Sequence, residues 1–502
     1  MSDALTELRE RLAEIADLSA AGGLLGWDQQ TMMPERAAPQ RAEQLGTLGR
    51  IVHERFTDDM VGRLLDAAEP QVAGEGAPLA DAALVRVTRR DWEKARRVPA
   101  ELAADLARAG ALGHAAWVEA RERSDFAAFL PFLRRNVELK LRYVDCFEGY
   151  DDPYDVLLDD YEEGMTSAEV DALFTELRAG LVPLIAAIAD RADAVDDGPL
   201  HGDFPIAAQR ELVRRVLGRL GWRADGWRLD EAAHPFATSF GPGDVRLTTR
   251  YDASYVGMAL YGAIHEFGHG LYESQVDPAL ARGPLGDGVS LGVHESQSRL
   301  WENVVGRGRP FAGWLHGELR EVFPSRFETV SADDFFRAVN KVQPSLVRVE
   351  ADEATYGLHI ILRFELERAM IGGTVALEEL PEAWNARMRQ YLGVEVPSDA
   401  EGVLQDVHWS GGDIGYFATY ALGNLISAQL WARARADLPE LDAALAAGDG
   451  SGLRAWLGEH VHRFGRIYPP RDLVRRATGS AIRVEPFLEY LRAKLGPIYG
   501  LD

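Results

Sequence analysis

Two histidines four residues apart, with a glutamate beside the first, are the feature that most restricts what this chain can be. The stretch AIHEFGHGLYES covers residues 263–274 and contains His265, Glu266 and His269. On a helix, residues four apart share one face, so both imidazoles can bind a single metal ion. Glu266 would lie at the flank, where a carboxylate can accept a proton from a water molecule that the ion activates. The alternative interpretation is a pair of hydrogen-bonded core histidines, and this motif alone does not decide between the two.

The same segment is unusually rich in glycine for a helix. Gly262, Gly268 and Gly270 fall within or beside the motif, and glycine weakens a helix relative to alanine. Such positions are expected where another backbone or a ligand must approach closely. We therefore predict close packing around this helix.

A catalytic zinc site needs a third protein ligand and an open position for water. Glu273 lies on the same helical stripe but about 12 Å along it, too far for metal bonds of about 2 Å, so we expect it behind the ligands or at the surface. The segment 285–308, LGDGVSLGVHESQSRLWENVVGRG, predicts a glycine-rich turn followed by a second helix. Glu295 on that helix is the preferred third ligand, because Ser296 to Arg299 continue a polar turn. His294 is a rival ligand or a substrate-binding group.

Hydrophobic periodicity predicts a mainly α protein. Apolar residues recur three and four apart through 4–20, 101–123, 126–147 and 168–192, as in amphipathic helices. The segment 234–251, HPFATSFGPGDVRLTTRY, instead has β-branched residues around the turn signal GPGD. We predict a small β-hairpin there, next to the histidine helix. The expected organisation is one catalytic domain over 1–502, two-lobed, with its metal-binding core at about 234–424.

The charge balance limits the classes of partner. The formal net charge is -25, and the 54 Lys and Arg residues form no basic block, which argues against nucleic acid and other anionic partners. Nearly all of the positive charge is arginine, which genome composition explains most simply, and a salt-adapted host is the alternative explanation. Cys146 is the single cysteine, so no intramolecular disulfide can form. We see neither an apolar signal-peptide core nor a run of about 18 apolar residues, and we expect a cytoplasmic protein without a membrane partner.

The motifs together resemble the carboxypeptidase Taq family of metallocarboxypeptidases. HEFGH is followed by HESQSRLWEN, and similar segments stand in the family's order: HPF at 234–236, DVRLTT at 244–249, VRVEADEATYGLHIILRFELE at 347–367 and GVLQDVHW at 402–409. Ala418 stands where the family has proline. The resemblance implies a mainly helical, two-lobed protein with a deep central groove, usually a homodimer. It further implies zinc or cobalt as the metal, and removal of single C-terminal residues from peptides with broad specificity.

The resemblance assigns roles at matching positions. His265, His269 and Glu295 would be the metal ligands and Glu266 the general base. Arg348 would anchor the terminal carboxylate of the substrate, because the planar guanidinium binds carboxylates through paired hydrogen bonds.

Asp352 is predicted to be a substrate-site residue that orients Arg348 or another cation. The alternative is a salt bridge between Arg348 and Asp352 within one helix.

The segment 404–420, LQDVHWSGGDIGYFATY, contains His408, Tyr416 and Tyr420 among turn residues. His408 is predicted to hydrogen bond a substrate carbonyl or carboxylate. Of Tyr416 and Tyr420, we prefer Tyr420 as a donor to the developing oxyanion, the alternative for both being an aromatic core residue.

Three further residues have more general predicted roles. His234 and Arg246 should shape the wall of the substrate site, and Asp287 should support a ligand histidine through its second nitrogen.

Other functions must be weighed against carboxypeptidase activity. An endopeptidase or peptidyl-dipeptidase on a similar helical scaffold would keep HExxH and the third ligand but would not need Arg348. A non-catalytic binding protein would be marked by loss of Glu266 or Glu295, and both are present.

Overall fold

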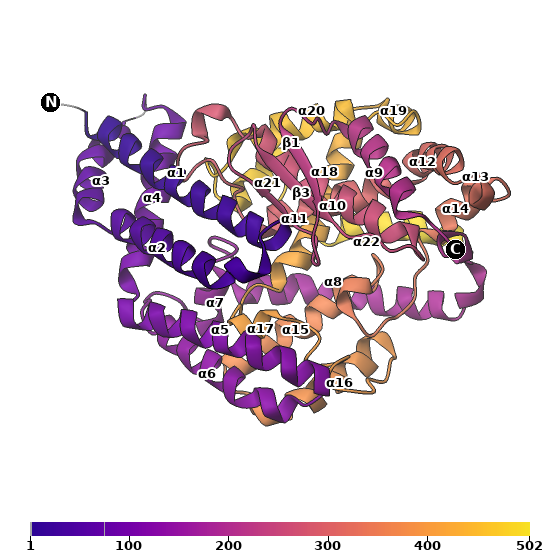
Figure 1. Ribbon diagram of the computed structural model, residues 1–502, viewed down its shortest axis with the longest axis horizontal. Helices are drawn as coiled ribbons and strands as arrows, with labels where there is room; N and C mark the ends of the chain where they lie inside the picture. The colour runs from indigo at the N-terminus through magenta and orange to yellow at the C-terminus, as the bar shows by residue number, and fades with distance from the viewer. Residues whose placement is uncertain (1–2, 75, 502) are drawn as a thin grey trace.

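The computed structural model describes residues 3–74 and 76–501 and confirms a mainly helical protein with one small sheet (Figure 1). The N-terminal helices are α1 (Ala4–Thr31), α2 (Ala38–Phe56), α3 (Asp59–Val72), α4 (Leu79–Arg97), α5 (Ala100–Arg123), α6 (Phe126–Val144), α7 (Pro153–Leu158) and α8 (Ser167–Ala189). The central elements are α9 (Ile206–Leu220), β1 (Trp227–Glu231), β2 (Ala237–Ser239), β3 (Val245–Thr249), α10 (Val256–Gln275), α11 (Leu291–Arg299), the π-helix η5 (Leu300–Gly306), α12 (Arg309–Val322), α13 (Pro324–Phe327) and α14 (Ala332–Ala338). The C-terminal helices are α15 (Tyr356–Ile371), α16 (Leu380–Leu392), α17 (His408–Gly411), α18 (Ala418–Asp437), α19 (Leu441–Ala446), α20 (Ser451–His460), α21 (Pro470–Thr478) and α22 (Glu485–Tyr499). Short 3₁₀ turns are η1 (Glu35–Ala37), η2 (Ala192–Ala194), η3 (Gly198–Leu200), η4 (Pro278–Leu280), η6 (Arg348–Glu350), η7 (Leu377–Glu379) and η8 (His462–Phe464).

The predicted hairpin is present and belongs to a three-stranded sheet. Strand β2 pairs antiparallel with β3, and Thr238 lies opposite Arg246. The third strand, β1, pairs parallel with β3, with Leu229 opposite Leu247. The sequence did not indicate β1, because a parallel partner follows a crossover and leaves no local turn signal.

Helix α10, which carries HEFGH, lies between the sheet and the rest of the helical core. It packs against β2, β3, α9, α11 and η5. Two of its glycines have the predicted role: a Cβ at Gly268 would lie 2.5 Å from the carbonyl oxygen of Gln297, and one at Gly270 would lie 2.7 Å from Trp227 and Val245 side-chain atoms. At Gly262 the nearest such atom is 3.7 Å away, so close packing does not explain that glycine.

Helix α11 is clamped between α10 and α18. Its start follows from sequence, because the Ser290 hydroxyl caps the helix by accepting a hydrogen bond from the backbone N–H of Val293 at 3.2 Å. A second cap comes from far along the chain, since buried Glu162 accepts a hydrogen bond from the backbone N–H of Gly292. The position of α11 is thus fixed at its start and on both flanks.

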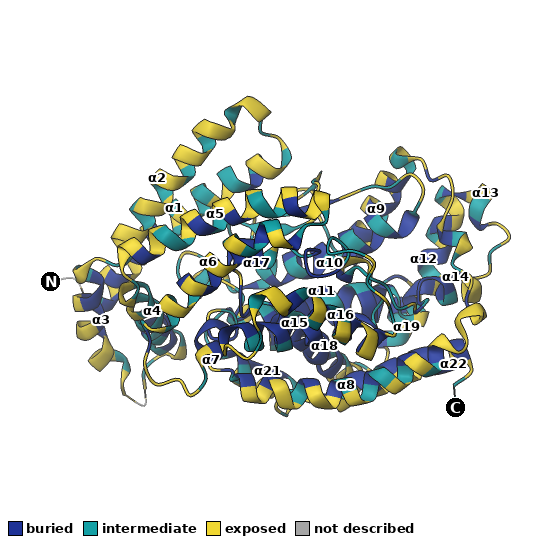
Figure 2. Cartoon of the chain, turned by 90° about the horizontal axis from the view of Figure 1, so that it is seen from below, coloured by how far each residue is buried: buried dark blue, intermediate teal, exposed yellow. Residues whose placement is uncertain are grey.

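Burial separates a large core from a smaller one in the N-terminal helices. The main core includes α10, α11, α15 and α18, which are dark in Figure 2. A separate cluster, containing Leu8, Leu65 and Val87, joins α1, α3 and α4. Helix α2 has no buried residue, and in Figure 2 it lies at the upper left edge of the molecule, coloured mainly as exposed.

Helix α8 bears on the expectation that the chain does not span a membrane, although Glu176 and Arg178 interrupt its apolar residues. Within the described residues it is the one helix long and apolar enough to qualify by length and composition. Its buried residues, including Val170, Phe174, Leu177 and Leu181, recur three and four apart and join the main core. The opposite face is exposed (Figure 2), which is the pattern of an amphipathic helix lying on a core.

Candidate active site

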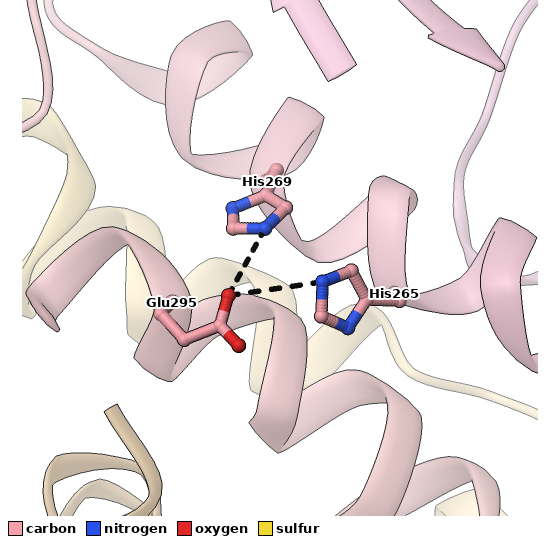
Figure 3. A group of neighbouring side chains, drawn as sticks. All are labelled: His265, His269 and Glu295. Atoms are coloured by element: carbon pink, nitrogen blue, oxygen red, sulfur yellow. Dashed lines mark ion pairs between the residues drawn. The ribbon is translucent and has the colours of Figure 1, made fainter. Parts of the chain in front are cut away.

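His265, His269 and Glu295 converge from two neighbouring helices on one point (Figure 3). Oε2 of Glu295 lies 3.7 Å from Nε2 of His265 and 3.4 Å from Nε2 of His269. Metal bonds of about 2.0–2.1 Å in a tetrahedron would separate ligand atoms by about 3.3 Å. The three ligand atoms, all within 4.8 Å of one another, therefore fit a single divalent ion. Two imidazoles and one carboxylate are also the donor set of catalytic sites that keep one position open.

The second nitrogen of each predicted ligand histidine has its own partner. Nδ1 of His265 lies 2.9 Å from Oε2 of Glu302. Nδ1 of His269 lies 2.6 Å from Nδ1 of His294, whose Nε2 lies 2.6 Å from Oε1 of Glu273. Such contacts fix the orientation and tautomer of metal-binding imidazoles. Glu273 thus lies behind the ligands, one of the two places predicted for it.

These contacts correct two sequence-based predictions. His294 is neither a third ligand nor free for substrate, because both ring nitrogens are bonded to His269 and Glu273. The prediction that Asp287 supports a ligand histidine is wrong. The second ring nitrogens of His265 and His269 contact Glu302 and His294 instead. Asp287 is exposed.

The two carboxylates at the centre have opposite electrostatic settings. Burial opposes ionisation of Glu295, but Arg299 and the two histidines hold its pKa well below the usual range. Nε of Arg299 donates to Oε1 of Glu295 at 2.6 Å, which leaves Oε2 on the metal side. Burial raises the pKa of Glu266 to about 7, a value suited to both taking up and giving back a proton near neutral pH.

Arg348 belongs to a buried cluster of two arginines around one aspartate. It begins η6 and is bonded to Oδ1 of Asp406 by Nε and Nη2, both at 2.8 Å. Nε of Arg363 donates to Oδ2 of the same carboxylate at 2.6 Å. Nη1 of Arg348 donates to the hydroxyl of Tyr356 at 3.1 Å.

This cluster has spare capacity for one anion. A guanidinium carries five N–H donors, and three of those on Arg348 are engaged by Asp406 and Tyr356. Burial lowers the pKa of Arg363 only to about 10, so both arginines are charged at neutral pH. One carboxylate balances two cations, and the cluster keeps one uncompensated positive charge.

Asp352 does not orient Arg348, contrary to prediction. Oδ1 accepts hydrogen bonds from the backbone N–H groups of Ala354 and Thr355 at 2.9 and 3.0 Å, and Oδ2 accepts one from Gln343 at 3.0 Å. Asp352 therefore shapes the turn into α15. The alternative of an intrahelical salt bridge is also excluded, because Arg348 lies in η6, before α15 begins at Tyr356.

His408 and Tyr420 lie together beside this cluster. Nε2 of His408 is 3.2 Å from the hydroxyl of Tyr420, and its Nδ1 is buried with no hydrogen-bond partner among the described residues. Burial, together with Arg348 and Arg363, lowers the pKa of His408 to about 4. Burial raises the pKa of Tyr420 well above its usual value. At neutral pH both are therefore neutral, and the tyrosine keeps its proton. The ring of Tyr416 contacts both.

His234 and Arg246 are not joined to the metal ligands by any contact among the described residues. His234 is exposed in the loop between β1 and β2. Arg246 on β3 pairs with Asp244 at 2.8 Å and stacks over the rings of Trp27 and Phe240. Arg246 thus ties α1 to the sheet, which is compatible with the predicted wall.

Three residues that the sequence analysis left unassigned are central to the site. Asp406 belongs to the motif GVLQDVHW, two residues before His408. Glu302 and Arg299 follow Glu295 at spacings that place them on one helical face. Glu302 lies in the π-helix η5, a conformation frequently found at functional sites.

The helical fold, the HExxH pair and the glutamate from a second helix define a helical metallopeptidase. The family model for carboxypeptidase Taq (M32) metallopeptidases matches residues 7–495. Thermostable carboxypeptidase 1 of Thermus thermophilus is 43% identical over 99% of both chains, and carboxypeptidase 1 of Bacillus subtilis is 39% identical over 99% of this chain and 98% of its own.

Solved structures agree over the whole chain. The M32 carboxypeptidase of Deinococcus radiodurans R1 has a TM-score of 0.96 and 44% identity, covering 99% of this chain and 100% of that one. The Pyrococcus furiosus carboxypeptidase, in a structure described as Apo-Mg, has a TM-score of 0.95 and 34% identity, covering 98% and 99% of the two chains. The chain belongs to the carboxypeptidase Taq (M32) metallopeptidase family. It is a metallocarboxypeptidase, a peptide hydrolase whose family implies a divalent metal.

Proposed function

We propose that this enzyme releases single amino acids from the free C-terminus of peptides, with broad side-chain specificity, and that its metal is zinc or cobalt. The observation that carries the proposal is the spare positive charge of the Arg348 cluster. Tyr356 connects this cluster to the predicted metal ligands, because it contacts both Arg348 and Arg299. A carboxylate is the natural complement to that charge. Because the terminal carboxylate is common to all peptides, its recognition leaves the preference for side chains open.

Two imidazoles and a carboxylate suit both zinc and cobalt. His265, His269 and Glu295 would hold the ion. When bound there, it would polarise the scissile carbonyl and lower the pKa of a water molecule towards neutrality.

Glu266 acts as the general base in this proposal. Its carboxylate takes a proton from the attacking water and then gives a proton to the leaving amine. Support comes from its position directly after His265 and from its burial at 6% exposed.

His408 and Tyr420 share one hydrogen bond and therefore act as a pair. If the tyrosine hydroxyl donates to Nε2, then Nδ1–H of His408 is free to donate to the substrate carboxylate. If Nε2–H donates instead, the tyrosine proton is free for the developing oxyanion, where a preorganised donor is worth about 3 kcal/mol. The contact of 3.2 Å between them supports this pairing.

We further propose a homodimer in the cytoplasm, without nucleic-acid partners. The net charge of -25 supports the exclusion of polyanions. The single cysteine is compatible with a reducing compartment.

Amino-acid release from an N-terminally blocked peptide tests the chemistry. Glu266→Gln should retain the metal but lose at least about a hundredfold in kcat, whereas His265→Ala should lose the metal itself. Full activity of the Glu266→Gln variant would exclude this residue as the base.

A further inference from the structure

Arg299 contacts residues of the predicted metal site on one side and Tyr356, which leads to Arg348, on the other. Its Nε donates to Oε1 of the predicted ligand Glu295 at 2.6 Å, and its Nη1 lies 3.7 Å from Oε2 of Glu302, the partner of His265. On its other side the guanidinium carbon lies 4.1 Å from the ring centre of Tyr356. Arg299 therefore stands between the metal ligands and α15.

Tyr356 continues the connection to the carboxylate anchor. Its ring carries Arg299, and its hydroxyl accepts a hydrogen bond from Nη1 of Arg348 at 3.1 Å. The side chain is 3% exposed, and the ring also packs edge-on against Tyr420. One rigid aromatic side chain thus contacts an arginine of the metal site through its face and the substrate anchor through its edge.

The connected groups come from separate elements. Glu295 and Arg299 lie on α11, Tyr356 begins α15, and Arg348 lies in η6. Through Tyr356 and Arg299, Arg348 is linked to Glu295 by a hydrogen bond, a ring contact and a second hydrogen bond. The separation between the attacked carbonyl and the terminal carboxylate determines how many residues are removed, so the spacing between these two sites is a determinant of specificity.

We propose that Arg299 and Tyr356 are positioning residues that hold Arg348 at a fixed distance from the metal ligands and so restrict cleavage to the last peptide bond. This inference rests on the proposed function of Arg348. It goes further because it names the residues that determine how many amino acids are released in each cleavage.

Two substitutions separate the two contacts. Tyr356→Phe keeps the ring beneath Arg299 but removes the acceptor for Arg348; KM should rise about tenfold, with metal release unchanged. Arg299→Met removes the bond to Glu295 and the stacked cation; metal affinity should fall about 10- to 100-fold. We also expect both variants to release a fraction of dipeptides, because the anchor is less firmly placed.

The readouts are steady-state kinetics, the masses of products from one peptide, and the rate of metal release to a chelator. Tyr391→Phe is a matched control, because Tyr391 also accepts from an arginine, Arg178 at 2.8 Å, and stacks beneath it. That pair lies on α8 and α16, and the control should keep wild-type kinetics. Arg387→Met, which removes a guanidinium bonded to Glu365 at 2.9 Å, is the control for Arg299→Met.

The inference is overturned if Tyr356→Phe behaves like Tyr391→Phe, or if Arg299→Met releases metal and products as the wild type does. Failure of the proposed function itself gives another outcome: the wild-type enzyme would cleave amidated and free peptides equally. That result would remove Arg348 as anchor and the inference with it.

Discussion

Gly423 of α18 lies directly against Glu295, the proposed third metal ligand: a Cβ at position 423 would be 2.7 Å from Cγ of Glu295 and 2.8 Å from its Cβ. Real Cβ atoms do not approach so closely, so Gly423→Ala must displace α18 or Glu295. We predict a fall in metal affinity of about tenfold or more, measured by calorimetric titration of the metal-free enzyme. Gly313→Ala is the control, because Gly313 in α12 faces open space and alanine there should stabilise the protein by up to about 1 kcal/mol. Equal metal affinities for the two variants would contradict the account.

His294 should act on the metal rather than on the substrate. Its ring joins His269 to Glu273, so His294→Ala frees the ligand to rotate and should weaken metal binding about 10- to 100-fold. With metal restored to saturation, KM should stay near the wild-type value. A large increase in KM with unchanged metal affinity would instead support the substrate role that sequence alone suggested.

Asp406 should be the main stabilising group of the arginine cluster. Asp406→Asn leaves Arg348 and Arg363 buried without a counter-charge, and breaking a buried ion pair in this way costs about 3 kcal/mol. Urea denaturation measures the loss. Asp333→Asn, which breaks an exposed pair with Arg309, should change the free energy of unfolding little. Similar losses in the two variants would show that the buried charges are not balanced as described.

Stability should fall in mild acid through His462. Its imidazole is buried with Nδ1 at 2.7 Å from the side-chain amide of Gln275 and Nε2 at 2.8 Å from that of Gln297, and burial lowers its pKa to about 3. The unfolded state, with a pKa of about 6.5, binds more protons between those two values, so stability is lost as the pH falls. His462 should contribute a loss of about 2 kcal/mol between pH 7.5 and 5.

The contribution of His462 is read as a difference between two pH profiles. His462→Gln lacks the titrating ring, so its free energy of unfolding should decline less steeply than that of the wild type over the same range. Parallel profiles would show that protonation of this histidine in the folded protein does not lower the free energy of unfolding.

The sequence identified groups whose geometry is local and missed those that depend on tertiary contacts. His265 and His269 follow from helical spacing, and Glu295 followed from a turn of the right length into a polar helix face. Asp352 seemed the partner of Arg348 because it is near in sequence; the actual partner, Asp406, is 58 residues away. No local pattern indicates such a pairing.

The same distinction between local signals and long-range contacts determines which parts of the fold were predictable. The helices predicted from periodicity, which are α1, α5, α6 and α8, and the hairpin of β2 and β3 lie at or close to the residues predicted for them. Strand β1 and the cap that Glu162 places on α11 join segments far apart in the chain. The family resemblance supplied Arg348 as an anchor, whereas its surplus charge could be counted only once Arg363 and Asp406 had been placed around it.

The most direct test of the central claim uses one peptide in two forms, with a free and with an amidated C-terminus. Each is incubated with the metal-loaded enzyme, and the products are weighed by mass spectrometry over time. We predict stepwise loss of single residues from the free form alone, and a loss of at least about a hundredfold in kcat/KM for Arg348→Ala. Equal cleavage of both forms at internal bonds would contradict the account and would mark an endopeptidase built on the same metal site.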